Sequence, residues 1–449
     1  MKLTLSPEDI QIVLGELDEA NRASARRYPG DSLRRQPVHT VYGGAQVFQS
    51  DTAPKLGALA RRSLQEYAAS PEEFGRVLGL PEALTTKIYE RVLAKLEREP
   101  VEDFRIDFED GYGNRPDAEE DGHAASTAGE VAKGLAAGTL PPHFGIRIKP
   151  FSEELKSRAI RTLDIFLTSL VGATGGRLPD NFAVTLPKVI APDQVTVLAS
   201  LLEQFERHLG LSERALLLEI MIETPQSVID AAGSAALPAL VAAARGRCLA
   251  AHFGTYDYTA SLNITATHQT MTHPACDFAK SVMQLALAGT GVWISDGATN
   301  VLPVPPHRVA AGGDPLSPRQ IADNRAAVHA AWRLHYGHVR HSLEGGFYQG
   351  WDLHPAQLPT RFAALYAFFL EDIEAASARL KNFVAKAGQA TLVGEVFDDA
   401  ATGQGLLNHF LRAWSCGAIT EEEAVEKSGL MSDELRSRSF VRILKGRRK

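Results

Sequence analysis

Apolar and polar positions alternate between two kinds of segment along most of the chain. Short runs rich in β-branched and aromatic residues, bounded by Gly, Pro or Asp, are typical of strands. Longer stretches between them, such as 157–172 and 193–210, repeat their apolar residues with the spacing of a helix. The predicted strands are 38–45, 103–111, 143–150, 182–189, 216–224, 248–258, 291–300 and 348–355.

This repeated strand–helix alternation predicts an α/β fold, a (β/α)8 TIM barrel of parallel strands. An open, doubly wound sheet is the alternative, but the turn after the first strand, GGAQVF (43–48), does not match the dinucleotide-binding fingerprint. An N-terminal helical segment is predicted within 1–36. We therefore expect a TIM barrel with an N-terminal extension over 1–375 and a C-terminal helical extension over 376–449.

Composition narrows the classes of protein to consider. Hydrophobic residues make up 45% of the chain and charged residues 22%, as in ordinary globular proteins. The net charge of −7 argues against nucleic acid as a partner. No apolar run reaches the length of a membrane span, and the N-terminus lacks the order of a signal peptide. Three scattered cysteines fit a reducing, cytoplasmic location.

Strand alternation places charged side chains inside the predicted barrel. Arg105, Asp107 and Glu109 share one face of the second strand, and Glu219 and Glu223 share one face of the fifth. Buried charges must find a partner, a metal or a ligand. For Arg105, Asp107 and Glu219, which come early on their strands, a closed internal salt-bridge network is the favoured interpretation.

Charged residues late on their strands favour function instead, because barrel enzymes keep their active sites at the carboxyl ends of the strands. Glu223 ends the fifth strand, and Asp257 is predicted to end the sixth. Two carboxylates from neighbouring strands, with no cysteine or paired histidine nearby, suit a hard cation such as Mg²⁺ or Mn²⁺. Nearby, Arg147 could bind a substrate carboxylate through two hydrogen bonds. Glu109 and Asp110 also fall in this late group.

Seven motifs in a fixed order resemble those of one superfamily. They are RIDFEDGYG, GIRIKPF, TLPKV, IMIETPQS, HFGTYDYTASL, WISDGATN and DLHPAQL. Over roughly residues 38–375 the chain resembles the citrate lyase beta-subunit, malyl-CoA lyase and 2-oxo-acid aldolase superfamily. Its members are phosphoenolpyruvate/pyruvate-binding TIM barrels.

The resemblance implies roles for individual residues. Glu223 and Asp257 resemble the ligands of a Mg²⁺ or Mn²⁺ ion, and Arg147 resembles the clamp on the substrate carboxylate. The matching motifs add four further site residues. Glu109 and Asp110 resemble groups around the metal-bound water, Lys188 falls near the barrel mouth, and His354 falls in a loop that helps close the site. For the general base the candidates are His39, His354 and Asp296, with His39 favoured.

The implied activity is that of a metal-dependent carbon–carbon lyase or aldolase. Its substrate would be a small 2-oxo or hydroxy acid, or the coenzyme A thioester of one, with the enolate stabilised by the divalent cation. A malate-synthase-like condensation of an acyl-CoA with glyoxylate is one alternative, and a non-catalytic subunit of a lyase complex is another. A homo-oligomer is expected.

Overall fold

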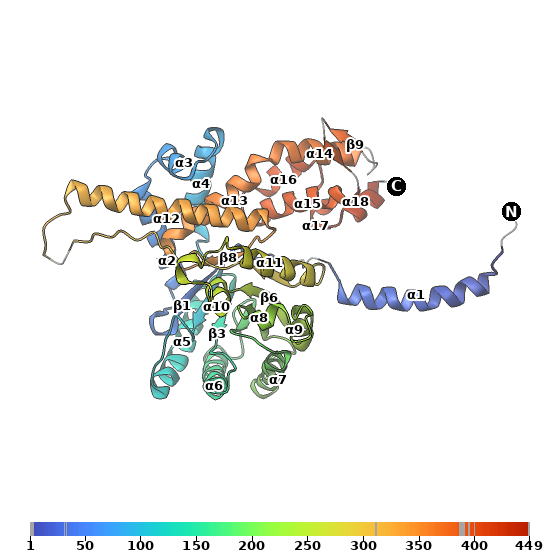
Figure 1. Ribbon diagram of the computed structural model, residues 1–449, viewed down its shortest axis with the longest axis horizontal. Helices are drawn as coiled ribbons and strands as arrows, with labels where there is room; N and C mark the ends of the chain where they lie inside the picture. The colour runs from blue at the N-terminus through green and yellow to red at the C-terminus, as the bar shows by residue number, and fades with distance from the viewer. Residues whose placement is uncertain are drawn as a thin grey trace.

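The computed structural model describes residues 4–30, 32, 34–309, 312–385, 391–393, 396–398 and 400–447. Its centre is a parallel sheet in the order β7-β6-β5-β4-β3-β2-β1-β8 (Figure 1). The strands are β1 (His39–Gly44), β2 (Asp103–Asp107), β3 (His143–Arg147), β4 (Phe182–Leu186), β5 (Leu217–Ile222), β6 (Cys248–Phe253), β7 (Trp293–Ser295) and β8 (Gly350–Asp352). Each lies within a segment predicted as a strand.

The sheet closes on itself between β7 and β8. The N–H of Asp296 donates to the carbonyl of Gln349 at 2.9 Å, and the N–H of Trp351 donates to the carbonyl of Gly297 at 3.1 Å. A parallel bridge between Ala298 and Trp351 completes this seam. The prediction of a (β/α)8 TIM barrel is thereby confirmed.

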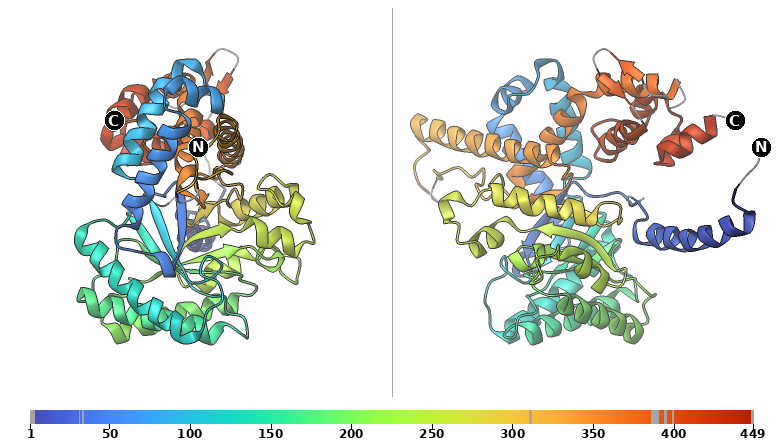
Figure 2. Two further views of the ribbon diagram at one scale, coloured as in Figure 1. Left: turned by 90° about the vertical axis from the view of Figure 1, so that its left-hand side faces the viewer. Right: turned by 45° about the vertical axis from the view of Figure 1, so that its right-hand side comes forward.

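Helices surround the outside of the barrel. Between β1 and β2 lie α2 (Thr52–Tyr67), α3 (Pro71–Leu78) and α4 (Glu82–Arg98). Between β2 and β7 lie α5 (Asp117–Ala137), α6 (Lys156–Thr174), α7 (Pro192–Leu209), α8 (Pro225–Val228), α9 (Leu237–Ala243), α10 (Thr255–Ser261) and α11 (Pro274–Leu287). In Figures 1 and 2, α5, α6 and α7 lie on the side of the sheet opposite α3 and α4.

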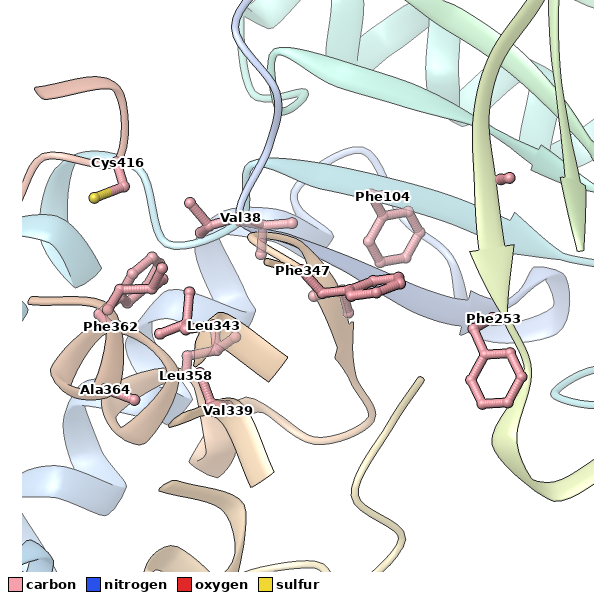
Figure 3. Packing of buried hydrophobic residues seen from close by; sticks show 14 of the residues in the cluster. Val38, Phe104, Phe253, Val339, Leu343, Phe347, Leu358, Phe362, Ala364 and Cys416 are labelled. Carbon is pink, nitrogen blue, oxygen red and sulfur yellow. The ribbon is translucent and has the colours of Figure 1, made fainter. Parts of the chain in front are cut away.

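Two long helices flank β8 and carry much of the core. A capping box at Ser317 starts α12 (Pro318–Glu344), and α13 (Leu358–Glu371) follows β8. Almost every residue of α13 is buried, because the helix packs against α12 on one side and α4 on the other. Figure 3 shows Phe362 of α13 close to Leu343 of α12.

The two ends of the chain are helical, as predicted. Helix α1 (Pro7–Arg27) has no buried residue and extends away from the barrel (Figure 1). The C-terminal elements are α14 (Ile373–Ala385), β9 (Thr391–Val393), β10 (Val396–Asp398), α15 (Ala400–Ser415), α16 (Glu421–Ser428), α17 (Ser432–Arg436) and α18 (Phe440–Arg447). A division at 375/376 would fall in the first turn of α14, and it stays a prediction. Among the described residues, no helix combines the length and apolarity of a membrane span.

A closed network of charges fills the barrel interior. The guanidinium of Arg105 donates to both carboxylate oxygens of Glu219, at 3.0 and 2.7 Å, and also pairs with Asp103. The hydroxyl of Thr185 donates to Glu219 at 2.9 Å. All of these side chains are almost fully buried. The predicted internal network is confirmed: Arg105 pairs with Glu219, and Asp107 also has a cationic partner, Arg147, described below.

We expect the variant Arg105→Met to lower the free energy of unfolding by about 3–5 kcal/mol, because it leaves two buried carboxylates without their cation. The matched control is Arg340→Met, since Arg340 pairs with Glu371 near the surface at 2.7 Å. Losing that pair should cost about 0–1 kcal/mol. Urea unfolding measures both. A cost for Arg105→Met no larger than that of the control would contradict the role given to the network.

Candidate active site

Glu223 directly follows β5 at the carboxyl end of the barrel, and only 1% of it is exposed. Its Oε1 accepts a hydrogen bond of 2.6 Å from the backbone N–H of Lys188, in the loop after β4. Gly254, which directly follows β6, lies beside it, and a Cβ atom at this position would collide with the Glu223 side chain. The carboxylate is therefore held between the ends of three adjacent strands.

Lys188 joins the acidic residues of this end. Its backbone has a φ of 50°, the left-handed conformation, which places it in a tight turn after β4. Its Nζ forms an ion pair with Glu109 and lies 3.3 Å from Asp110 and 3.4 Å from Asp257. One ammonium group thus connects side chains that follow β2 and β6.

Asp257 is not at the end of a strand, contrary to the prediction. Strand β6 ends at Phe253, and Asp257 lies in the first turn of α10. Gly254 separates the strand from α10, so β6 ends at Phe253, five residues before the end of the segment predicted as a strand (248–258). The Asp257 side chain is 41% exposed, so it faces the mouth from the rim while Glu223 lies beneath it.

Arg147, the last residue of β3, is engaged by the protein itself. Its Nε and Nη2 donate to Asp107 at 2.8 and 2.5 Å, and its Nη1 lies 3.0 Å from Glu109. The guanidinium stacks within 4.8 Å of the Tyr42 ring centre and 5.7 Å of Trp351. A substrate carboxylate would therefore have to share the Arg147 guanidinium with Asp107. The sequence predicted that Arg147 binds the substrate carboxylate, but it did not predict this competing partner.

Burial and crowding shift the pKa values of the mouth. Burial, reinforced by the nearby charge of Asp257, raises the pKa of Glu223 to about 8. Burial also raises the pKa of Glu109, despite Arg147 and Lys188 beside it. Although burial alone opposes the charged form of Lys188, the adjacent Glu109 and Glu223 hold its pKa above the ordinary value. The buried acids are thus short of compensating positive charge.

His39 does not reach this site. It is the first residue of β1, so it lies at the amino end of the barrel, while Glu223 lies at the carboxyl end. Its Nε2 accepts the backbone N–H of Glu102 at 3.1 Å, so its Nδ1 carries the proton and donates to Asp352 at 2.8 Å. Both ring nitrogens are hydrogen-bonded and the side chain has no exposed surface, so His39 has a structural role. The prediction of His39 as the general base is therefore wrong.

The other two candidates for a general base are also held by neighbours. His354 caps a short turn after β8, where its Nδ1 accepts the N–H of Ala356 at 3.1 Å. Asp296 accepts hydrogen bonds from Lys280 at 3.1 Å and Ser342 at 2.6 Å. His354 is on the correct end of the barrel, but no contact among the described residues joins it to Glu223 or Lys188.

Two residues of the mouth were missed as functional candidates. Asp107 was assigned to the interior network, but the register of β2 and β3 sets it directly opposite Arg147. Tyr42 of β1 packs on Arg147, and its buried hydroxyl has no hydrogen-bond partner in the part of the chain that the structure describes. The alternation of β1 could have indicated an inward Tyr42, but not its unpaired hydroxyl.

The donor set fits a magnesium-like cation better than a zinc-like one. Within the described residues, no three His, Cys, Asp or Glu side chains converge as a ready-made metal cage. Mg²⁺ does not need such a cage, because it binds through one or two carboxylates and keeps several waters. Glu223 and Asp257 supply two carboxylates, and burial with the charge of Asp257 raises the pKa of Glu223 in spite of Lys188 and Arg147.

The fold is a (β/α)8 TIM barrel. The chain belongs to the family described as "Domain of unknown function (DUF6986)", whose model matches residues 17–443. No curated protein matches the sequence.

Solved structures with this architecture include a citrate lyase from Burkholderia xenovorans LB400, which is 17% identical with a TM-score of 0.56. The match covers 87% of this chain and 96% of that one. A malate synthase of Haloferax volcanii in a magnesium/glyoxylate complex is 14% identical with a TM-score of 0.45, covering 90% and 98% of the two chains. At these identities the likeness to the citrate lyase establishes the fold alone.

The position of His39 leads to a prediction. The variant His39→Ala removes the acceptor of the Glu102 N–H and a partner of Asp352, so we expect a loss of about 1–3 kcal/mol in the free energy of unfolding. Mg²⁺ affinity should not change, because the residue lies at the other end of the barrel. Denaturant unfolding and calorimetry measure the two effects. Lost metal affinity in a folded His39→Ala protein would restore His39 to the site.

Proposed function

We propose that this protein is a metal-dependent carbon–carbon lyase or aldolase that acts on a small 2-oxo or hydroxy acid, or on its coenzyme A thioester. The observation that carries the proposal is the charge imbalance at the mouth. Among the described residues, five carboxylates gather there around two cationic side chains, Arg147 and Lys188. The carboxylates belong to Asp107, Glu109, Asp110, Glu223 and Asp257.

A divalent cation and an anionic substrate together would balance such a site. Glu223 and Asp257 would hold the cation, which when bound supplies Lewis-acid stabilisation of the charge that develops on a 2-oxo acid. Arg147, fixed in orientation by Asp107, would contribute positive charge toward the substrate carboxylate. Lys188, partly exposed, would contribute a second positive charge at the rim.

Tyr42 is our candidate for the proton donor in place of His39. Burial keeps the pKa of its phenol well above the ordinary value, so the group stays protonated at neutral pH. Its hydroxyl has no partner among the described residues, and its ring lies against Arg147. The hydroxyl is held in place beside Arg147, the side chain proposed to bind the substrate carboxylate. From there it could donate a proton to an oxyanion that leaves or develops during the reaction.

Metal binding provides the first test. A carboxyl with a raised pKa holds its proton near neutral pH, and a metal must displace that proton. We therefore expect Mg²⁺ affinity to rise with pH up to about 8, the pKa of Glu223, and then to level off. Calorimetry in buffers of different ionisation enthalpy measures both the affinity and the released proton.

The variants Glu223→Gln and Asp257→Asn should lose this binding, and Glu223→Gln should also lose the proton release. Glu213→Gln, at a side chain that is 86% exposed and outside the mouth, is the matched control and should bind normally. Equal Mg²⁺ affinity in the control and in both mouth variants would refute the metal site.

The reaction class needs a separate assay. With Mg²⁺ present, we expect cleavage of 2-oxo-4-hydroxy acids or of a β-hydroxyacyl-CoA, measured by release of the 2-oxo acid or aldehyde. Condensation of acetyl-CoA with glyoxylate that also hydrolyses the thioester and releases free coenzyme A thiol would instead indicate a synthase. Activity in neither direction, in protein that binds Mg²⁺, would favour a non-catalytic subunit.

Tyr42→Phe isolates the proton-transfer step. Removing a general acid should lower kcat by about 100-fold with little change in KM, because the ring and its packing remain. Steady-state kinetics on the substrate found above measure this split. An unchanged kcat would exclude Tyr42 from proton transfer and leave the metal site intact.

A further inference from the structure

A cavity of about 740 Å³ lies at the end of the barrel opposite Glu223. Its floor comes from residues where strands begin, such as Val38 before β1 and Trp293 at the start of β7. Its roof comes from the C-terminal helices, with Asn408 on α15 and Arg442 on α18. Figure 3 shows Val38 close to Cys416, where these two parts of the chain meet.

Four arginines line this cavity, and the described residues around it include no acid: the arginines are Arg34, Arg412, Arg438 and Arg442. Arg34, Arg438 and Arg442 form no ion pair with any residue that the structure describes. Their neighbours behave differently, since Arg436 pairs with Glu421 at 2.9 Å and Arg447 with Glu434 at 2.6 Å. Within residues 436–447, the two arginines that line the cavity, Arg438 and Arg442, thus differ from Arg436 and Arg447 in having no carboxylate partner among the described residues.

Two of the arginines are held in position without losing their charge. Arg438 has a φ of 51°, an uncommon conformation for a side-chain-bearing residue, and its Nη1 donates to the Ser32 carbonyl at 3.1 Å. Arg412 lies 3.8 Å from the ring centre of Tyr348 and donates to Gln36 at 3.4 Å. The cations are therefore arranged before any ligand arrives, which lowers the entropic cost of binding.

We propose that this cavity binds a small-molecule polyanion with at least two phosphate groups. Its volume is in the range of ordinary ligand sites. Guanidinium groups match phosphate oxygens through paired hydrogen bonds, and the amide nitrogen of Asn408, whose oxygen is held by Gln404 at 2.9 Å, adds a neutral donor. A protein with a net charge of −7 that gathers four arginines and no described acid around one cavity has a local potential there opposite to its overall charge.

The location of this site separates it from the proposed chemistry. The acidic mouth lies where the strands end, and the arginine cavity lies where they begin, so one small molecule does not reach both. A ligand here would contact the barrel floor and helices α15 and α18 together. Its binding is therefore expected to fasten the C-terminal helices to the barrel, as a regulatory ligand does.

Calorimetric titration of the full-length protein with inorganic pyrophosphate, without divalent metal, tests the proposal. We expect saturable binding that weakens as NaCl is raised. Arg442→Glu, at an exposed side chain, should weaken binding by at least about 10-fold, and Arg438→Gln should weaken it too. Arg177→Gln, at an exposed arginine away from the cavity, is the matched control and should bind like the parent protein.

Two further measurements define the ligand and the place. Pyrophosphate should bind more tightly than citrate, and equal or tighter citrate binding would overturn the phosphate assignment. Lys188→Met, at the mouth, should leave pyrophosphate binding unchanged. Binding that is lost in Lys188→Met but kept in folded Arg442→Glu would place the anion at the mouth and overturn the site, as would no binding at millimolar pyrophosphate.

Discussion

The interior of this barrel depends on the neutralisation of buried charge. Carboxylates inside a closed sheet cost several kcal/mol each unless a cation meets them. Between the barrel and helices α12 and α13 Asp352 receives His39 and Arg361, and inside the barrel Glu219 receives Arg105. These pairs fix the strands relative to one another, because each joins side chains from different parts of the chain. The helices outside can then pack on an interior that is already specified.

At the carboxyl end the same rule is only partly met. Asp107 takes most of the hydrogen-bonding capacity of Arg147, and Lys188 is shared among several acids. Glu223 is left buried and inclined to keep its proton. Inside the barrel the charges of carboxylates and cationic side chains are balanced, but at the carboxyl ends of the strands the carboxylates are in excess. This excess of negative charge marks the mouth as the candidate functional site. The opposite end of the molecule has the reverse imbalance, with cations in excess.

The sequence predicted the architecture because strand alternation and Gly or Pro breakers are local signals. It also predicted that Glu109, Arg147, Lys188, Glu223 and Asp257 come together, and the structure places them at one mouth. Alternation gives the face on which a side chain lies but not its height along the barrel, and His39 was misplaced in both: it lies on the face of β1 opposite Tyr42, against Phe362 of α13, and at the amino end of the strand. Nor does it give partners: the pairing of Arg147 with Asp107 follows from the register of two strands, which no single segment encodes.

The seam between β7 and β8 has a consequence for how the molecule moves. Two short strands meet there through few backbone hydrogen bonds, whereas the other neighbours pair along longer registers. Local opening is least costly where the fewest bonds must break. Amide hydrogens at the seam should therefore exchange with solvent sooner than those of β4 and β5. A barrel of this kind can loosen on one side while the strands that carry Lys188 and Glu223 stay closed.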